Sequence, residues 1–434
     1  MADDRAVELA SLAEAIADLD HPTKVSTSEW AASELGRRDL VAADADSSFA
    51  LDDWRRCAER GIFRMMVPED QGGAGAGLAE VLLTLEGLGH GCADNGLTFA
   101  VASQMLSTQV ALTNFASPAQ RERWLPGLLD GSLLAALAMT EPGSGSDAFA
   151  MAARAVRLDD GSYRIDGHKA YLTFGPVCDL VIVFASTRPE AGSWGISAFL
   201  VDTSLPGVRR SAVREKMGMR TTPFGDIELD GVIVPADALL GREGAGARIF
   251  ASILDIERSY VFAPQVGARQ RHVEASVAFA REREQGGGPI ARYQAVSHRI
   301  VAMKERHERA RLFLYRAAIA QTAGRDVTMA ASLAKIVACD TGIESSLDMA
   351  TIHGARGYVT EFEVERAVRD AVGGLAYSGS TDVLRNVVAR LLGLGCARAD
   401  TLHDRTSRDR TPQTSAGSSS SVTSTSSVVG GDSA

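Results

Sequence analysis

The hydrophobic and polar positions of the chain follow two different periods, and the change of period divides the chain into segments. Up to about residue 135, apolar residues recur at helical spacing, as over 51–61 and 78–88. Between about 137 and 240, short runs with strand character are separated by turns rich in Asp, Gly and Pro. The predicted strands are 153–158, 163–166, 180–185, 196–201 and 226–234.

Helical periodicity returns after Gly244. It predicts helices over about 244–283, 289–323, 328–353 and 362–396, with a glycine-rich loop at 373–379. Pro264 is expected to bend the first of these helices. The chain thus divides into an N-terminal helical domain (1–135), a middle β domain (136–242) and a C-terminal helical bundle (243–397). Residues 398–434 are rich in Ser and Thr and contain no aromatic residue, which predicts a disordered tail.

Composition narrows the class of protein. Hydrophobic residues make up 45% and charged residues 23% of the chain, as in globular proteins. We find no apolar run long enough for a bilayer and no secretory signal, and the five cysteines are scattered without metal-site spacing. We therefore expect a cytoplasmic protein with no metal site and no membrane contact. The formal net charge of -10 argues against a nucleic-acid partner, because binding phosphates needs clustered Lys and Arg.

Five motifs stand out along the chain, and we assign no chemistry to the third. The first, at 138–147, reads AMTEPGSGSD, where glycines allow a ligand close to the backbone and Thr140 and Ser146 offer hydroxyls. Alone, it could equally be a polar turn that opens a strand. The others, in chain order, are GHKAYLT at 167–173, EKMGMRTT at 215–222, Arg283 with QGGGPI at 285–290 and Gln294, and HGARGY at 353–358.

The order of these motifs, in a chain that runs from helices through a β domain to a helical bundle, resembles that of the acyl-CoA dehydrogenases over roughly residues 5–396. The resemblance implies an α+β fold with an N-terminal helical domain, a middle β-barrel or sandwich domain and a C-terminal four-helix bundle. It also implies an FAD-dependent oxidoreductase acting on CH–CH groups, assembled as a homo-oligomer, either a tetramer or a dimer. In the family, the Arg and Gln of the fourth motif reach the FAD of a neighbouring subunit.

The resemblance transfers cofactor contacts to this sequence residue by residue. Tyr171 takes the place of the family's usual Trp beside the flavin, Gly286 that of a Phe, and Thr351 that of a cofactor-contacting Gln. These departures leave the local detail of the flavin site open. The positions predicted to contact FAD are Met139, Thr140, Ser146, Tyr171, Thr173, Arg283, Gln294, Gly354, Ser380 and Asp382.

Desaturation of a thioester needs a base for the weakly acidic α-proton. Most family members supply a Glu from a Tyr-Glu-Gly-Thr loop, but here the loop reads Tyr377-Ser378-Gly379-Ser380. Glu257-Arg258 resembles the helix that carries the base in isovaleryl-CoA and long-chain acyl-CoA dehydrogenases. On a helix, Glu257 shares a face with apolar side chains, where a charged group needs a reason to persist. On the residues alone, pairing with Lys or Arg of a neighbouring helix is an equal alternative. The missing Glu at 378 and the resemblance favour the catalytic base.

Glu257 is therefore the predicted catalytic base. The residues predicted to bind substrate are Ser146, Arg258, Tyr377 and Ser378, the last through its backbone N–H.

The identity of the thioester is less sharply defined. Tyr-Ser-Gly at 377–379 together with a helix-borne Glu resembles a branch that oxidises aminoacyl groups, such as prolyl, on peptidyl carrier proteins in natural-product assembly. A short or branched CoA ester is the alternative, since CoA and the carrier present the same pantetheine. A flavin monooxygenase and a non-catalytic flavoprotein are two further classes. The electron acceptor is expected to be an electron-transfer flavoprotein or oxygen.

Overall fold

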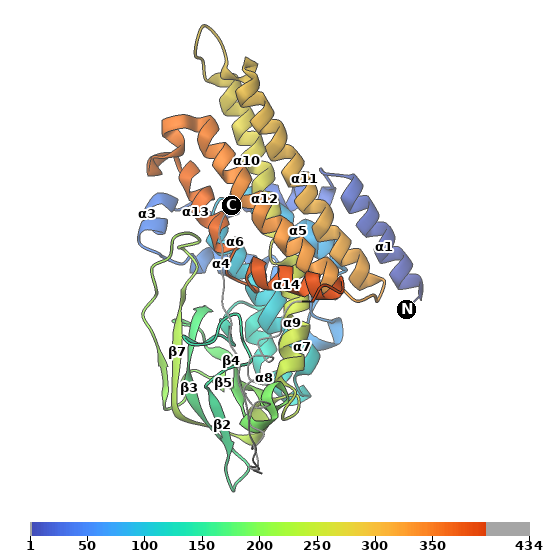
Figure 1. Ribbon diagram of the computed structural model, residues 1–434, viewed down its shortest axis with the longest axis vertical. Helices are drawn as coiled ribbons and strands as arrows, with labels where there is room; N and C mark the ends of the chain where they lie inside the picture. The colour runs from blue at the N-terminus through green and yellow to red at the C-terminus, as the bar shows by residue number, and fades with distance from the viewer. Residues whose placement is uncertain (1, 396–434) are drawn as a thin grey trace, which may run out of the picture.

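The computed structural model describes residues 2–395, which form a helical N-terminal part, a sheet and a long helical bundle (Figure 1). The predicted tail at 398–434 and Cys396 lie outside the described residues. The other four cysteines are free and buried. No helix within residues 2–395 is both long and apolar enough to cross a membrane.

The N-terminal part consists of short helices, several of which begin at a side-chain cap. Ser117 and Gln120 form a capping box at the start of α8, and Asp94 accepts a hydrogen bond from Leu97 N at the start of α6. The elements are α1 (Ala2–Ala17), α2 (Pro22–Glu34), α3 (Leu40–Ala45), α4 (Leu51–Glu59), α5 (Leu78–Gly91), α6 (Asn95–Ser103), the π-helical η3 (Gln104–Gln109), α7 (Val110–Phe115) and α8 (Pro118–Leu129).

The middle of the chain forms one mixed sheet. Its strand order is β6-β7-β3-β2-β4-β5-β8, and β1 pairs in parallel with β4. The predicted strands match β2, β3, β4, β5 and β7, whereas β1, β6 and β8 are too short to show a period. The strands are β1 (Ala135–Ala138), β2 (Arg154–Arg157), β3 (Tyr163–Thr173), β4 (Leu180–Ser186), β5 (Ile196–Asp202), β6 (Val208–Arg210), β7 (Phe224–Val234) and β8 (Leu239–Leu240).

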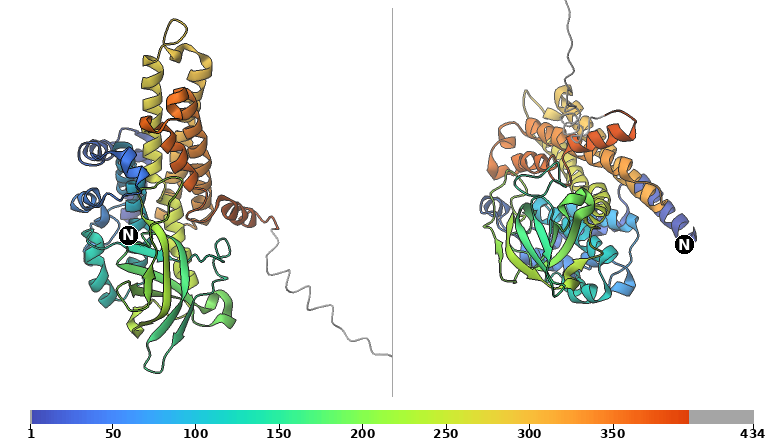
Figure 2. Two further views of the ribbon diagram at one scale, coloured as in Figure 1. Left: turned by 90° about the vertical axis from the view of Figure 1, so that its left-hand side faces the viewer. Right: turned by 60° about the horizontal axis from the view of Figure 1, so that its bottom comes forward.

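The C-terminal part is helical, and its longest helices stand side by side at the end of the molecule away from the sheet (Figures 1 and 2). Pro264 is near the start of α10, and the predicted helix over 244–283 is divided there into α9 and α10. A loop at 374–380 separates the last two helices. The helices are α9 (Gly246–Tyr260), α10 (Ala263–Glu282), α11 (Gln294–Thr322), α12 (Thr328–His353), α13 (Val364–Gly373) and α14 (Thr381–Leu391).

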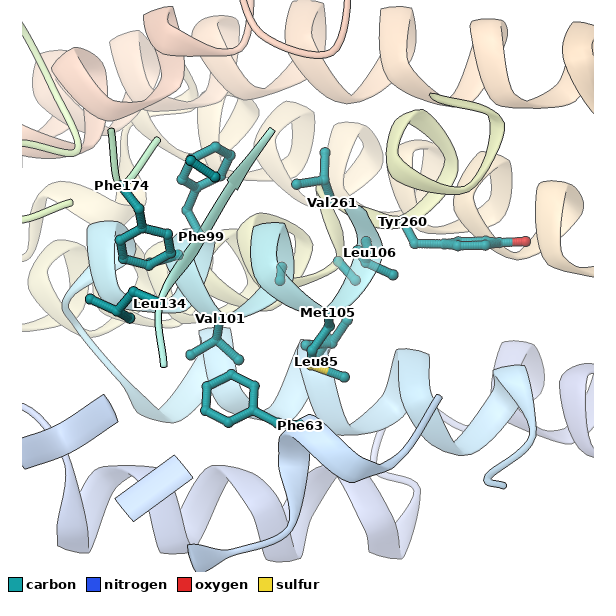
Figure 3. Packing of buried hydrophobic residues seen from close by; sticks show 14 of the residues in the cluster. Phe63, Leu85, Phe99, Val101, Met105, Leu106, Leu134, Phe174, Tyr260 and Val261 are labelled. Carbon is teal, nitrogen blue, oxygen red and sulfur yellow. The ribbon is translucent and has the colours of Figure 1, made fainter. Parts of the chain in front are cut away.

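One hydrophobic core joins the three parts. Figure 3 shows Phe63, Leu85 and Met105 of the N-terminal part packed near Tyr260 and Val261 at the end of α9. The same cluster contains Phe174, which directly follows β3. Because apolar burial continues across all three parts, α9 is held in a fixed position relative to the sheet and to the bundle. The predicted α+β fold with these three parts is confirmed.

Candidate active site

Glu257 lies in the last turn of α9 and is partly buried. Its carboxylate accepts a hydrogen bond from the Ser378 hydroxyl, with 2.6 Å between Oγ and Oε1. Ser378 belongs to the loop between α13 and α14, so the bond joins two segments 121 residues apart. The structure therefore brings together the predicted base and the loop residue that replaces the family's usual Glu.

Ser378 is held from a second side by Arg258, whose Nε donates to the Ser378 carbonyl at 2.9 Å. Ser378 has φ 55° and Gly379 has φ 86°, so two successive residues adopt the left-handed conformation. A non-glycine residue in this region is uncommon and persists only where its surroundings fix it. Here Arg258 and Glu257, neighbours on α9, together fix the loop.

Tyr377 anchors the same loop through its ring. The ring stacks on that of Phe262, with ring centroids 5.1 Å apart, and is tilted against that of Phe99, with ring centroids 4.8 Å apart. Cys339 Sγ donates to the carbonyl of Gly374 at the start of the loop. The predicted substrate-binding residues Arg258, Tyr377 and Ser378 thus lie around Glu257, on α9 and the loop.

Burial raises the pKa of Glu257, and the hydrogen bond from Ser378 and the nearby Arg258 charge oppose this rise in pKa. Within residues 2–395, Glu257 makes no ion pair with a cation on another helix. The alternative interpretation, a structural ion pair, therefore has no partner in the described part of the chain. A desolvated carboxylate of raised pKa suits a general base near neutral pH.

A second group of predicted residues lies on the sheet. Tyr171 is 53% exposed and has φ 63°, at the register shift between Lys169 and Leu172 in β3. The Thr140 carbonyl accepts from Ala170 N at 2.9 Å, so the first and second motifs are in direct contact. Met139 is buried, whereas Ser146 is exposed.

Asp226 of β7 holds the exposed segment of β3, a role that the sequence did not reveal. It accepts hydrogen bonds from Arg214, from His168 Nε2 at 3.0 Å and from Tyr171 N at 3.2 Å. Mainly because of the bond from Arg214, the pKa of Asp226 is lowered to about 2. Arg214 also lies 5.5 Å from the Tyr171 ring centroid. From the sequence alone, an aspartate in a predicted strand is expected to point into solvent. Its hydrogen-bond partners become visible only when the strands are paired.

Glu141 and Lys169 form a second network that the sequence did not reveal. Lys169 Nζ donates to Glu141 Oε1 at 2.8 Å and to the Met139 carbonyl at 3.1 Å, and its side chain is fully buried. Glu141 also accepts from the backbone N–H groups of Ala152 and Ala153. The ends of the Ser146 loop are thereby fixed to β3.

The remaining predicted cofactor contacts lie elsewhere. Arg283 caps the C-terminus of α10, and Gln294 begins α11, so both are at the projecting end of the α10–α11 hairpin (Figure 2). Gly354 follows α12 with φ 58°. Ser380 caps the start of α14, and Asp382 is exposed and pairs with Arg385. Within one protomer, Arg283 and Gln294 do not approach Glu257, because α10 alone spans about 30 Å.

Comparisons with known proteins cover nearly the whole described chain. Models of the N-terminal, middle and C-terminal domains of acyl-CoA dehydrogenases match residues 23–132, 136–232 and 244–393. The L-prolyl-[peptidyl-carrier protein] dehydrogenase of Pseudomonas fluorescens is 36% identical over 346 residues, which are 80% of this chain and 91% of the relative.

Two solved structures are similarly close. The prolyl acyl carrier protein oxidase AnaB has a TM-score of 0.84 and 35% identity, over 86% of this chain and 98% of its own. PigA, solved with FAD and proline, has a TM-score of 0.82 and 30% identity, over 86% of this chain and 97% of its own. On these matches, the chain belongs to the acyl-CoA dehydrogenase family.

Proposed function

We propose that this protein is an FAD-dependent dehydrogenase that desaturates a prolyl or similar aminoacyl thioester, held on a carrier protein, between its α and β carbons. The substrate class is supported by the prolyl-carrier dehydrogenase and oxidase among the similar proteins. The chemistry is supported by one observation above the others, the partly buried Glu257 carboxylate hydrogen-bonded to Ser378. A CoA ester would present the same pantetheine thioester to this site.

The residues present on the sheet fit a flavin. Tyr171 offers an exposed aromatic face, and within the described residues the hydroxyls of Thr140, Ser146 and Thr173 make no hydrogen bond. Free hydroxyls and a flat ring are the groups that a polar heterocycle can contact. Met139, Thr140, Tyr171 and Thr173 would hold the ring system from the sheet, with Ser380 and Asp382 contributing from the start of α14. FAD would supply the acceptor for the hydride that leaves the β carbon.

Glu257 takes the proton from the α carbon. The electron pair of the broken Cα–H bond forms the new Cα=Cβ bond as a hydride leaves the β carbon, and the α-proton stays on Glu257. Bound FAD would accept the two electrons and one proton of that hydride. The hydroxyl of Ser378 fixes the carboxylate orientation. The Ser378 N–H makes no hydrogen bond within residues 2–395 and is available to the thioester carbonyl, where negative charge develops.

We further propose that the enzyme is a homo-oligomer. Arg283 and Gln294 lie at the projecting end of the hairpin, and both are exposed. A guanidinium pairs well with the oxygens of a pyrophosphate. Because these residues cannot reach the Glu257 site of their own protomer, their contact with FAD requires a neighbouring subunit.

The decisive experiment measures anaerobic flavin bleaching by a prolyl thioester. Glu257→Gln should keep FAD but reduce the bleaching rate by at least about 10²-fold, because general-base catalysis contributes that much or more. Asp255→Asn is the matched control, since Asp255 is a carboxylate two residues earlier on α9 that makes no ion pair with the loop. Equal bleaching by Glu257→Gln and the unmodified enzyme would exclude Glu257 as the base.

A further inference from the structure

The surface at the N-terminal end of α9 has an exposed Trp and several arginines that have no part in the chemistry at Glu257. Trp194 of η4 (Pro189–Gly195) is 78% exposed, which is unusual for the largest side chain. Arg188 Nη2 donates to the Trp194 carbonyl at 3.2 Å, and Arg188 lies 4.0 Å from Glu243. A Cβ built on Gly244 would lie 2.7 Å from the Trp194 carbonyl oxygen, so η4 packs directly against the residues that lead into α9.

Two further arginines flank this point. Arg242 and Arg248 are exposed and, within the described residues, make neither an ion pair nor a side-chain hydrogen bond. The charge of Arg188 is balanced by that of Glu243. Glu190 can offset only one of the two remaining arginines, Arg242 and Arg248, so the surface has an excess of positive charge. The chain has a net charge of -10, so a positively charged surface beside an exposed Trp differs from the chain as a whole. Trp and Arg are also the residues that most often dominate binding between proteins.

α9 connects this surface to the base. Glu257 lies eleven residues after Gly246, a rise of about 16 Å along the helix axis. Phe250 lies two turns before Glu257 on the same face, and its ring is 6.4 Å from that of Phe149 in the Ser146 loop. Phe149 is 43% exposed. An extended phosphopantetheine arm is long enough to run from the start of α9, past these two rings, to Glu257.

We infer that Trp194, Arg242 and Arg248 form the docking surface for the carrier protein, with Arg188 supporting the Trp194 carbonyl. The partner is a carrier domain that is acidic around its phosphopantetheine-bearing serine, where the arm's own phosphodiester adds negative charge. Arg242 and Arg248 attract this acidic surface, and Trp194 supplies the apolar contact. This inference rests on the proposed function and adds to it the surface that binds the carrier domain beyond its pantetheine arm.

The test compares one acyl group on two supports, prolyl thioester on a carrier domain and prolyl thioester on free pantetheine, with the full-length holoenzyme. Arg248→Glu and Trp194→Ala should each lower kcat/KM for the carrier-bound thioester at least about tenfold, which corresponds to the loss of an interface anchor worth about 1.4 kcal/mol. Both variants should turn over the pantetheine thioester as the unmodified enzyme does. Rising salt should slow the unmodified enzyme on the carrier and affect Arg248→Glu less.

Arg325→Glu is the matched control, because Arg325 is exposed, follows α11 and makes no side-chain hydrogen bond or ion pair within the described residues. It should leave both substrates unaffected. If the unmodified enzyme oxidises the carrier-bound group and the Arg248 and Trp194 variants do so equally well, the docking surface is wrong and the proposed function stands. If the unmodified enzyme accepts only the pantetheine or CoA thioester, the carrier substrate itself is wrong and the docking surface is rejected with it.

Discussion

Ser378 and Glu257 determine each other's properties at the scale of single residues. The serine stands in a left-handed backbone conformation, and its hydroxyl lies 2.6 Å from the carboxylate that it orients. Burial raises the pKa of Glu257, while the bond from Ser378 favours the ionised form and lowers that pKa. Ser378 therefore keeps the Glu257 carboxylate ionised at a lower pH than burial alone would allow.

Replacing Ser378 by Ala should shift the pH dependence of the reaction. Without the hydroxyl, the pKa of Glu257 rises, so the acidic limb of the kcat/KM profile should move to higher pH. At pH values well above this limb, the rate should fall by less than about tenfold, because the proton acceptor itself remains. Ser378→Gly is the backbone-matched comparison, because glycine tolerates the left-handed conformation, and it should move the limb as Ser378→Ala does. An unchanged profile in Ser378→Ala would mean that the hydrogen bond does not act on the base.

The sequence pattern points to Glu257 as the proposed base but does not reveal its hydrogen-bond partner. Helical spacing placed Glu257 on an apolar face, since that pattern depends only on residues within two turns. Its hydrogen bond to Ser378 joins residues 121 apart, and a local pattern cannot contain such a contact. Taken alone, Ser at 378 in place of Glu could mean a degenerate or repurposed enzyme, whereas in the folded chain the serine donates a hydrogen bond to Glu257, the proposed base.

At the scale of secondary structure elements, the buried Lys169–Glu141 ion pair fixes the loop beside β3. Local periodicity predicted β4, β5 and α12 to within one or two residues, because their burial is regular along the chain. It stopped β3 at residue 166, although the strand continues to Thr173. The continuation depends on cross-strand partners in β7 and includes an irregular register, which no period of two can show.

Lys169→Met should destabilise the protein by about 3 kcal/mol, because it leaves the buried Glu141 carboxylate without its cation. Chemical denaturation monitored by intrinsic fluorescence measures this change in the free energy of unfolding. Lys304→Met is the control, since the Lys304–Glu308 pair is exposed and contributes at most about 0.5 kcal/mol. A loss as small as that of the control would show that Glu141 is satisfied by its backbone donors alone.

Asp226 should contribute stability that depends on pH. Arg214, with His168 and Tyr171 N, lowers the pKa of Asp226 from 3.8 to about 2 in the folded protein. The contribution is therefore complete above the ordinary aspartate pKa and is lost as the pH falls through about 2. Asp226→Asn should lower the Tm at neutral pH, and the Tm difference from the unmodified protein should shrink as the pH falls from about 4 to about 2.

Asp230→Asn provides the comparison for this titration, because Asp230 is an exposed carboxylate on the same strand that pairs with Arg209. Its Tm should stay close to that of the unmodified protein at every pH. A constant Tm difference for Asp226→Asn across the acidic range would contradict the role assigned to the Asp226 charge.

At the scale of the whole molecule, the predicted cofactor contacts separate into two sets. One set surrounds Glu257 and the sheet, and the other, Arg283 and Gln294, is carried away from it by the length of α10. The order of the motifs along the chain indicated both sets. Only the fold shows that a single protomer cannot bring them together, because sequence order carries no distance.

Mixed oligomers test whether Arg283 acts across a subunit boundary. Glu257→Gln and Arg283→Ala should each be poorly active as homo-oligomers. Co-refolded or co-expressed, they should regain dehydrogenation, because a site with Glu257 from one protomer and Arg283 from its neighbour is complete. Activity that stays at the sum of the two separate variants would show that Arg283 acts within its own protomer or not at all.

The projecting α10–α11 hairpin has a consequence for handling the enzyme. If each flavin is held partly by a neighbour's hairpin tip, binding of cofactor and association of subunits are linked equilibria. Dilution below the concentration at which protomers associate should then release yellow cofactor into the filtrate, and added FAD should drive protomers back together. Loss of colour on dilution would thus report quaternary structure without any measurement of size.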